Sequence, residues 1–436
     1  MKLDYSLIHL LLACALFPGY YTLGPLFKIA LMPYVSYLVL TRNARLIPAL
    51  AIHFIPGSTV STLILVCCSL LPATQIKELQ RKKLATLYLI AALPLPLIFY
   101  RTATLFKQTT LSWADVLQSP TLYLGIFPFF YGVLSSTTFD RKVFNQVLLV
   151  LVFAMFLQLL YPTNFTVRYV FLAVPVFFTF LFLSFIAPQL TITSKLFSLA
   201  IPLASCALIV IGAIQLTFAV LATTAVAITF ILARLWSSRT VSKFPLGKLL
   251  AFAAILLTVY LVNDGLTSDQ NVDAASITEA RSLNDLISAL RFKAFGDRAP
   301  LWAGAWRGIY EERNLWPPER PPFISYETAS GVKLEVDFGA HNIGLELLRH
   351  FGIAIGVTGI LVYLAIIVHV STTIFRRALP LQLLILGATV LASAFVGGIV
   401  GQYVLMCNYS FLLMSLAGIV YGYPWNPGQL RGRRLD

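Results

Sequence analysis

The chain has 436 residues, of which 58% are hydrophobic and only 11% are charged. A soluble domain carries about 25% charged residues, so this composition excludes an ordinary soluble protein and makes the lipid bilayer the natural solvent. The net charge of +14 would suggest nucleic acid for a soluble protein, but here Lys and Arg gather in short segments between apolar runs. Cytoplasmic loops of membrane proteins show this pattern, so we expect no nucleic-acid partner.

Apolar runs of roughly 17 to 25 residues, long enough to cross the hydrocarbon core, recur along the chain. They predict an all-α fold, a polytopic transmembrane bundle of about 12 spans. With every basic cluster on the cytoplasmic side, the spans alternate consistently and both chain ends are cytoplasmic. The expected spans are 5–20, 24–40, 84–100, 119–136, 142–161, 169–187, 196–211, 213–233, 247–263, 343–370, 379–398 and 402–422.

Residues 46–73 do not fit one upright span. The segment is too long, it is interrupted at Ile55-Pro56-Gly57, and basic clusters flank both of its ends. Because both ends are then cytoplasmic, we expect a re-entrant hairpin or two short helices that both cross.

One long stretch without a membrane-crossing run divides the chain into three parts. Residues 1–263 are predicted to form the N-terminal transmembrane helices, 264–342 a large external loop, and 343–436 the C-terminal transmembrane helices with a basic cytoplasmic tail. The external loop and the helix turn after it contain most of the acidic residues. This clustering indicates a folded or functional unit outside the membrane.

The external loop is predicted to be partly helical. Ser276-Ile277-Thr278-Glu279 is a capping box, which predicts a first loop helix. A second helix is expected at 299–312, where the aromatic side chains of Trp302, Trp306 and Tyr310 would share one face. The Pro-rich segment 317–322 is expected to end that helix and to impose extended chain.

A polar stripe opens the span that follows the loop. Asn342, Glu346, Arg349 and His350 recur at helical spacing. Ionisable groups at membrane depth are costly, and they face a cavity or each other. The stripe could therefore line a site, or its charges could pair and only hold helices together; the sequence leaves both interpretations open.

The residues around this stripe have side chains suited to phosphate and sugar chemistry. His341 precedes it at the expected water–lipid boundary, where an imidazole can accept a proton from a hydroxyl. Arg298 opens the second loop helix, and a guanidinium there can bind phosphate with two hydrogen bonds. Trp302 and Trp306 could pack against the face of a sugar ring, or they could belong to an aromatic belt at the membrane interface. Arg168 is a further cation on the outer side, or an ordinary snorkelling residue.

Neither the cysteines nor the acidic residues form a strong metal motif. All five cysteines fall in apolar runs, without disulfide or zinc spacing. Glu335 and Asp337 would share a face in an extended segment and could bind Mg²⁺ or Mn²⁺. Two solvated loop acids are the simpler interpretation, so we expect no metal and no cofactor.

The string Arg298-x-x-Leu301-Trp302, followed by His341-Asn342, nine residues and Gly352, resembles the signature of the O-antigen ligase superfamily. In that family a large periplasmic loop between two late spans carries an Arg near its first helix and a His-Asn or His-Ser pair at its end. The resemblance covers roughly residues 250–420, and it covers the first half only through the pattern of spans.

This resemblance implies a bacterial inner-membrane glycosyltransferase. The donor would be a glycan on undecaprenyl diphosphate, and the acceptor would be a hydroxyl of a glycan or of lipid A-core on the periplasmic side. His341 would be the general base, with Glu346 orienting it or sharing its proton, and Arg298 would stabilise charge on the diphosphate.

The resemblance also implies the remaining site residues. An Arg that many members carry near residue 213 is missing here, so Arg168 or Arg307 is expected to bind diphosphate in its place. The substrate-binding set is completed by Trp302, Trp306, Asn342 and Arg349.

Two other functions stay open at this point. Polymerases of the same superfamily show Arg-x10-Gly in periplasmic loops, and Arg320 and Gly331 have this spacing. A polysaccharide or lipid transporter would also have many spans and intramembrane charges, although the two halves of the chain show no readable repeat.

Overall fold

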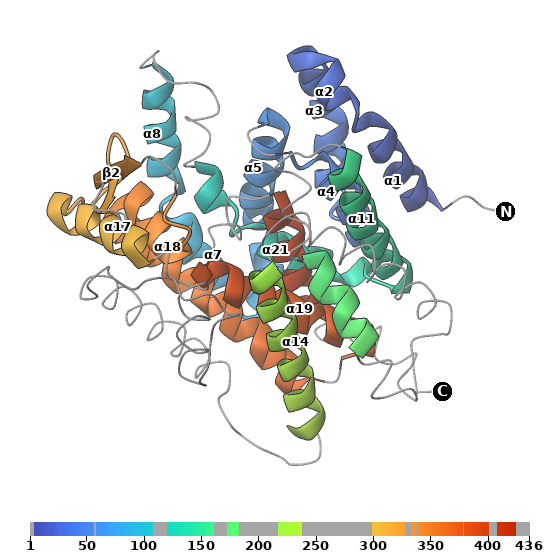
Figure 1. Ribbon diagram of the computed structural model, residues 1–436. Coiled ribbons are helices and arrows are strands. Elements are labelled where there is room, and N and C mark those ends of the chain that lie inside the picture. The colour runs from blue at the N-terminus through green and yellow to red at the C-terminus, as the bar shows by residue number, and fades with distance from the viewer. Residues whose placement is uncertain are drawn as a thin grey trace.

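The computed structural model describes residues 4–55, 58–107, 120–160, 172–182, 217–237, 299–327, 333–336, 339–377, 379–400 and 408–423 (Figure 1). Several predicted features lie outside these described residues. They are the spans at 196–211 and 247–263, the boundary at 263–264, the capping box at 276–279, Arg168, Arg298, Gly331, Asp337, Cys206 and Cys407.

Helices make up most of the described residues. Those before residue 161 are α1 (Tyr5–Leu16), α2 (Gly19–Thr22), α3 (Gly24–Leu40), η1 (Ala44–Leu46), α4 (Ile47–His53), α5 (Thr59–Thr74), α6 (Ile76–Arg81), α7 (Ala85–Ala92), α8 (Leu95–Lys107), α10 (Pro128–Ser135), η2 (Ser136–Thr138) and α11 (Arg141–Leu160). An apolar helix over Leu172–Phe182 follows. The later elements are α14 (Thr217–Ser237), α17 (Ala299–Glu312), β1 (Ile324–Glu327), β2 (Lys333–Val336), α18 (Ile343–Arg376), α19 (Leu381–Val400) and α21 (Asn408–Gly422).

Four of the described helical stretches are long and apolar enough to cross a membrane. They are Tyr5–Thr22, Ala85–Leu105, Ile343–Arg376 and Leu381–Gly398. Shorter apolar helices occupy other predicted spans, including Gly24–Leu40 and Ser410–Gly422. The chain is therefore a predominantly helical membrane protein, and the total of 12 spans stays a prediction.

The interrupted segment 46–73 forms two helices on either side of its break. α4 ends at His53 and α5 begins at Thr59. The Ser58 hydroxyl accepts a hydrogen bond from the Ser61 N–H at 3.1 Å and so caps α5. The break is confirmed; its placement as a re-entrant hairpin stays a prediction.

Small residues allow α10 and α21 to cross closely. A Cβ atom built on Gly132 would overlap the Ser415 carbonyl, and one built on Gly418 would overlap the Phe129 carbonyl. Backbones can approach this closely only where side chains are absent, as at many helix interfaces in membranes.

Replacing Gly418 with Ala should lower the thermal unfolding temperature, because the new methyl group meets rigid backbone. Overpacking of this kind costs about 1–3 kcal/mol. Gly387→Ala is the control, since its Cβ would meet only side-chain atoms of Val420 and Ile374, at 3.0 Å and 3.3 Å. Unfolding of both variants can be followed in detergent by circular dichroism. Equal unfolding temperatures for the two would show that this crossing is not tightly packed.

A small unit made of α17, a β-hairpin and the first turns of α18 lies at one side of the molecule (Figure 1). α17 spans the residues predicted for the second loop helix, so this prediction is confirmed, and it ends at Glu312, before the Pro-rich segment. β1 and β2 pair antiparallel, with Ile324 opposite Val336. This hairpin was not predicted, and it is the one departure from the all-α class among the described residues.

Candidate functional site at the start of α18

Asn342 fixes where α18 begins. Its side-chain carbonyl accepts hydrogen bonds from the N–H groups of Gly344 and Leu345, at 3.0 Å and 3.2 Å. An Asn in this position satisfies donors that the first helical turn would otherwise leave without partners. The side chain is 2% exposed, so the structure uses the amide of this predicted substrate-binding residue as a helix cap.

Glu346 lies buried at the centre of a charged cluster. One carboxylate oxygen accepts the backbone N–H of Ala340. The other oxygen lies 3.2 Å from Nη2 of Arg349 and 3.0 Å from Nε2 of His350. The charged residues of the polar stripe therefore pair with one another, which was one of the two interpretations of the sequence. This pairing compensates the negative charge of the buried Glu346 carboxylate.

Arg349 connects this cluster to the segment that follows α17. We call that segment, residues 313–323, the strap. Nη2 of Arg349 binds Glu346, and Nη1 donates to the Pro322 carbonyl at 3.0 Å. The side chain is 2% exposed, so this guanidinium is held between a carboxylate and a carbonyl.

His341 adopts a backbone conformation that residues other than glycine seldom adopt. Its φ angle is +54°, in the left-handed region, where residues with a Cβ atom are uncommon and often functional. Its two neighbours are both fixed, since Glu346 binds the N–H of Ala340 and Asn342 caps α18. The imidazole is half-buried, and it lies at the N-terminal end of a candidate membrane helix, next to the polar stripe.

Gly352 breaks α18 and joins it to the strap. Its φ and ψ are 71° and 178°, a combination that essentially only glycine adopts. Beyond the break, the N–H of Ile353 donates to the Asn314 carbonyl at 2.9 Å, and the N–H of Ala354 donates to the Leu315 carbonyl at 3.1 Å. The glycine of the predicted signature thus has a structural role, because it lets strap carbonyls replace the interrupted helical bonds.

Arg101 of α8 also holds the strap, and sequence reasoning missed it. Its Nη2 atom donates to the Pro317 carbonyl at 2.8 Å. The only signal in the sequence was a single Arg at the end of an apolar run. Nothing local could place that Arg beside a segment more than 200 residues later in the chain.

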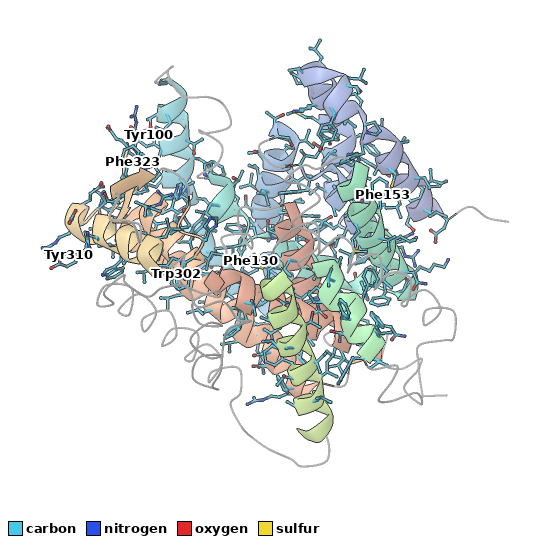
Figure 2. All side chains as sticks on the ribbon, viewed as in Figure 1. Tyr100, Phe130, Phe153, Trp302, Tyr310 and Phe323 are labelled. Carbon is cyan, nitrogen blue, oxygen red and sulfur yellow. The ribbon has the colours of Figure 1, made fainter. Side chains whose placement is uncertain are left out.

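The two tryptophans of α17 lie in different surroundings. Trp302 is fully buried in an apolar cluster with Leu301, Ile324 and Leu345, whereas Trp306 and Tyr310 are exposed. Figure 2 shows Tyr310 at the outer end of α17. Burial therefore divides the predicted aromatic row, because Trp302 packs inside the apolar cluster while Trp306 and Tyr310 stay exposed.

Of the three predicted diphosphate-binding arginines, only Arg307 lies among the described residues. Arg307 is exposed on α17 and makes no described contact with Glu346 or Arg349. Arg298 and Arg168 lie outside the described residues. Where the structure is described, no three metal-ligating side chains cluster; Glu335 is on β2, opposite Ser325.

The chain was compared with protein-family models, with curated proteins and with solved structures, and none of them matches it. The resemblance to O-antigen ligases therefore stays a prediction based on the residues quoted above.

Replacing Arg349 with Gln should destabilise the protein by about 3–5 kcal/mol, because Glu346 would keep its buried negative charge but lose the guanidinium that pairs with it. Arg81→Gln is a matched control. Arg81 is also three residues from its carboxylate partner, Glu78, but its side chain is 83% exposed, and exposed pairs contribute about 1 kcal/mol or less. Thermal unfolding in detergent measures both effects. Similar unfolding temperatures would mean that the buried cluster does not hold the strap to α18.

Proposed function

We propose that this chain is a membrane glycosyltransferase. It would transfer a glycan from undecaprenyl diphosphate to a hydroxyl of a glycan or lipid A-core acceptor, on the periplasmic side of a bacterial inner membrane. The observation that carries the proposal is the half-buried His341, fixed in a left-handed conformation at the end of a membrane helix. Strained backbone of this kind is found at sites where a side chain must be aimed.

The proposed reaction needs one proton acceptor and one anion-binding group. The acceptor oxygen attacks the anomeric carbon of the donor while its proton passes to the His341 imidazole. The bond from that carbon to the diphosphate breaks, and the diphosphate leaves with the electron pair. A positioned base contributes about 100- to 10,000-fold to such a step. Because the diphosphate is already a good leaving group, the reaction needs neither ATP nor a metal ion.

The other residues have supporting roles in this proposal. Glu346 positions His341 through the backbone of Ala340, and Asn342 does so through the helix cap. Arg298 stabilises charge on the leaving diphosphate, as the resemblance implies.

Within the superfamily we favour a ligase over a polymerase. The His341-Asn342-x9-Gly352 spacing supports this choice, since Asn342 and Gly352 each have a defined structural role beside His341. The polymerase spacing depends on Arg320, which is an exposed residue of the strap, and on Gly331.

A glycan profile of a deletion strain tests the proposed function. Loss of a ligase should leave full-length glycan on its lipid carrier at the outer face, with none attached to the acceptor. Single repeats attached to the acceptor would indicate a polymerase instead. Lipid-linked glycan confined to the inner leaflet would contradict both and would indicate a transporter.

A further inference from the structure

Arg101 carries a charge that the described protein does not compensate. The residue lies in the candidate span Ala85–Leu105, close to its end. Its one described hydrogen bond goes to a neutral carbonyl, that of Pro317, and no carboxylate among the described residues pairs with it. An ionisable group within a membrane helix is costly and is by default a candidate for a functional site.

Two other arginines that contact or belong to the strap differ from Arg101 in charge pairing or in exposure. Arg349 is neutralised by Glu346 at 3.2 Å. Arg313 is exposed on the strap, with its guanidinium 4.8 Å from the centre of the Tyr310 ring. Arg101 is half-buried, and among the described residues a single carbonyl accepts from its guanidinium. A guanidinium has five N–H donors in a planar fork, which suits the oxygens of a phosphate.

The surroundings of Arg101 are those expected at the level of lipid headgroups. The neighbouring Tyr100 and the strap residues Leu315, Trp316 and Phe323 are each more than half exposed. Figure 2 shows Tyr100 and Phe323 on the same side of the molecule, where α8 meets the strap. Exposed aromatic side chains of membrane proteins gather at the water–lipid interface, which is also where lipid phosphates lie.

We propose that the Arg101 guanidinium binds the phosphate of a lipid at the outer headgroup level, beside the strap. Either a lipid-linked diphosphate or a phospholipid headgroup could supply this chemistry. Assignment to the diphosphate rests on the proposed function, which requires such a donor. The strap then links the two parts of the site, because it contacts Arg101 at Pro317 and the kink of α18 at Asn314 and Leu315.

The test is the affinity of the purified full-length chain in nanodiscs for undecaprenyl diphosphate, with Arg101→Gln, Arg101→Lys and the control Arg313→Gln. Loss of a charge-assisted hydrogen bond to phosphate should weaken binding about 10- to 100-fold in Arg101→Gln. Arg101→Lys should bind with intermediate affinity, because it keeps the charge but not the planar fork. Arg313→Gln should bind as the unaltered chain does. An unchanged unfolding temperature of Arg101→Gln would show that the fold is kept without the bond to the Pro317 carbonyl.

Phosphatidylglycerol, measured in the same way, identifies the source of the phosphate. Selective weakening of undecaprenyl diphosphate binding in Arg101→Gln supports the donor site. Equal weakening for both lipids supports a general headgroup site and overturns the donor assignment. Unchanged affinity for both overturns the proposal. Arg101-dependent binding in a chain that transfers no glycan would instead overturn the proposed function and leave the phosphate site standing.

Discussion

Replacing His341 with Asn is expected to reduce glycan transfer by about 100- to 10,000-fold, because the reaction loses its proton acceptor. Asn is preferable to Ala here, since Asn tolerates the left-handed backbone that position 341 adopts. The fold and the cap at Asn342 should therefore persist. Initial rates of transfer in membranes, together with the unfolding temperature of the purified protein, separate loss of chemistry from loss of structure.

His369→Asn is the matched control for this variant. His369 lies on the same helix, α18, and its Nδ1 lies 2.7 Å from the carbonyl oxygen of Ala365, far along the helix from the candidate site. Its transfer rate should stay close to that of the unaltered chain. A His341→Asn chain with an unchanged rate would exclude His341 as the base.

Replacing Gly352 with Ala is expected to detach the strap from α18. A Cβ atom at this position would lie 2.5 Å from the Trp316 carbonyl oxygen and 2.8 Å from that of Asn314. The φ of +71° would also be strained for any residue other than glycine. Backbone strain and two weakened hydrogen bonds together predict a destabilisation of about 2–5 kcal/mol. Transfer should fall as well, because the strap would no longer hold its place beside Arg349.

Gly359→Ala provides the comparison, in the same helix and without a positive φ. The atoms nearest to its Cβ would be side-chain atoms of Tyr123 and Leu347, at 3.2 Å and 3.3 Å. The hydrogen-exchange rates of the Ile353 and Ala354 amides report on the two hydrogen bonds to the strap. These rates should rise in Gly352→Ala but not in Gly359→Ala. Equal protection of these amides in both variants would show that the kink does not depend on glycine.

The sequence predicted those parts of the fold that local chemistry determines. Helical spacing and the prolines at 317–322 placed α17 correctly, and the Pro-Gly pair at 56–57 marked the break between α4 and α5. Asn342 and Glu346 were recognised because polar residues are rare at the start of an apolar span. Each of these signals lies within a few residues of the feature that it predicts.

Features that depend on distant segments were not predicted. The hairpin of β1 and β2 requires two four-residue strands to pair, and neither strand is long enough to show a clear period. Gly352 was part of the recognised signature, but its kink depends on carbonyls from Asn314 and Leu315. Arg101 reaches the site through a contact with Pro317 that no local pattern encodes.

The transferase assignment is tested most directly by following a labelled glycan in proteoliposomes that contain the purified chain, the undecaprenyl diphosphate-linked donor and the acceptor. With EDTA present and no nucleotide added, we expect the label to move to the acceptor and an equal amount of undecaprenyl diphosphate to be released. The His341→Asn chain should leave the label on the donor. If the label stays on its lipid carrier with the unaltered chain as well, and only changes leaflet, the protein is a transporter and not a transferase.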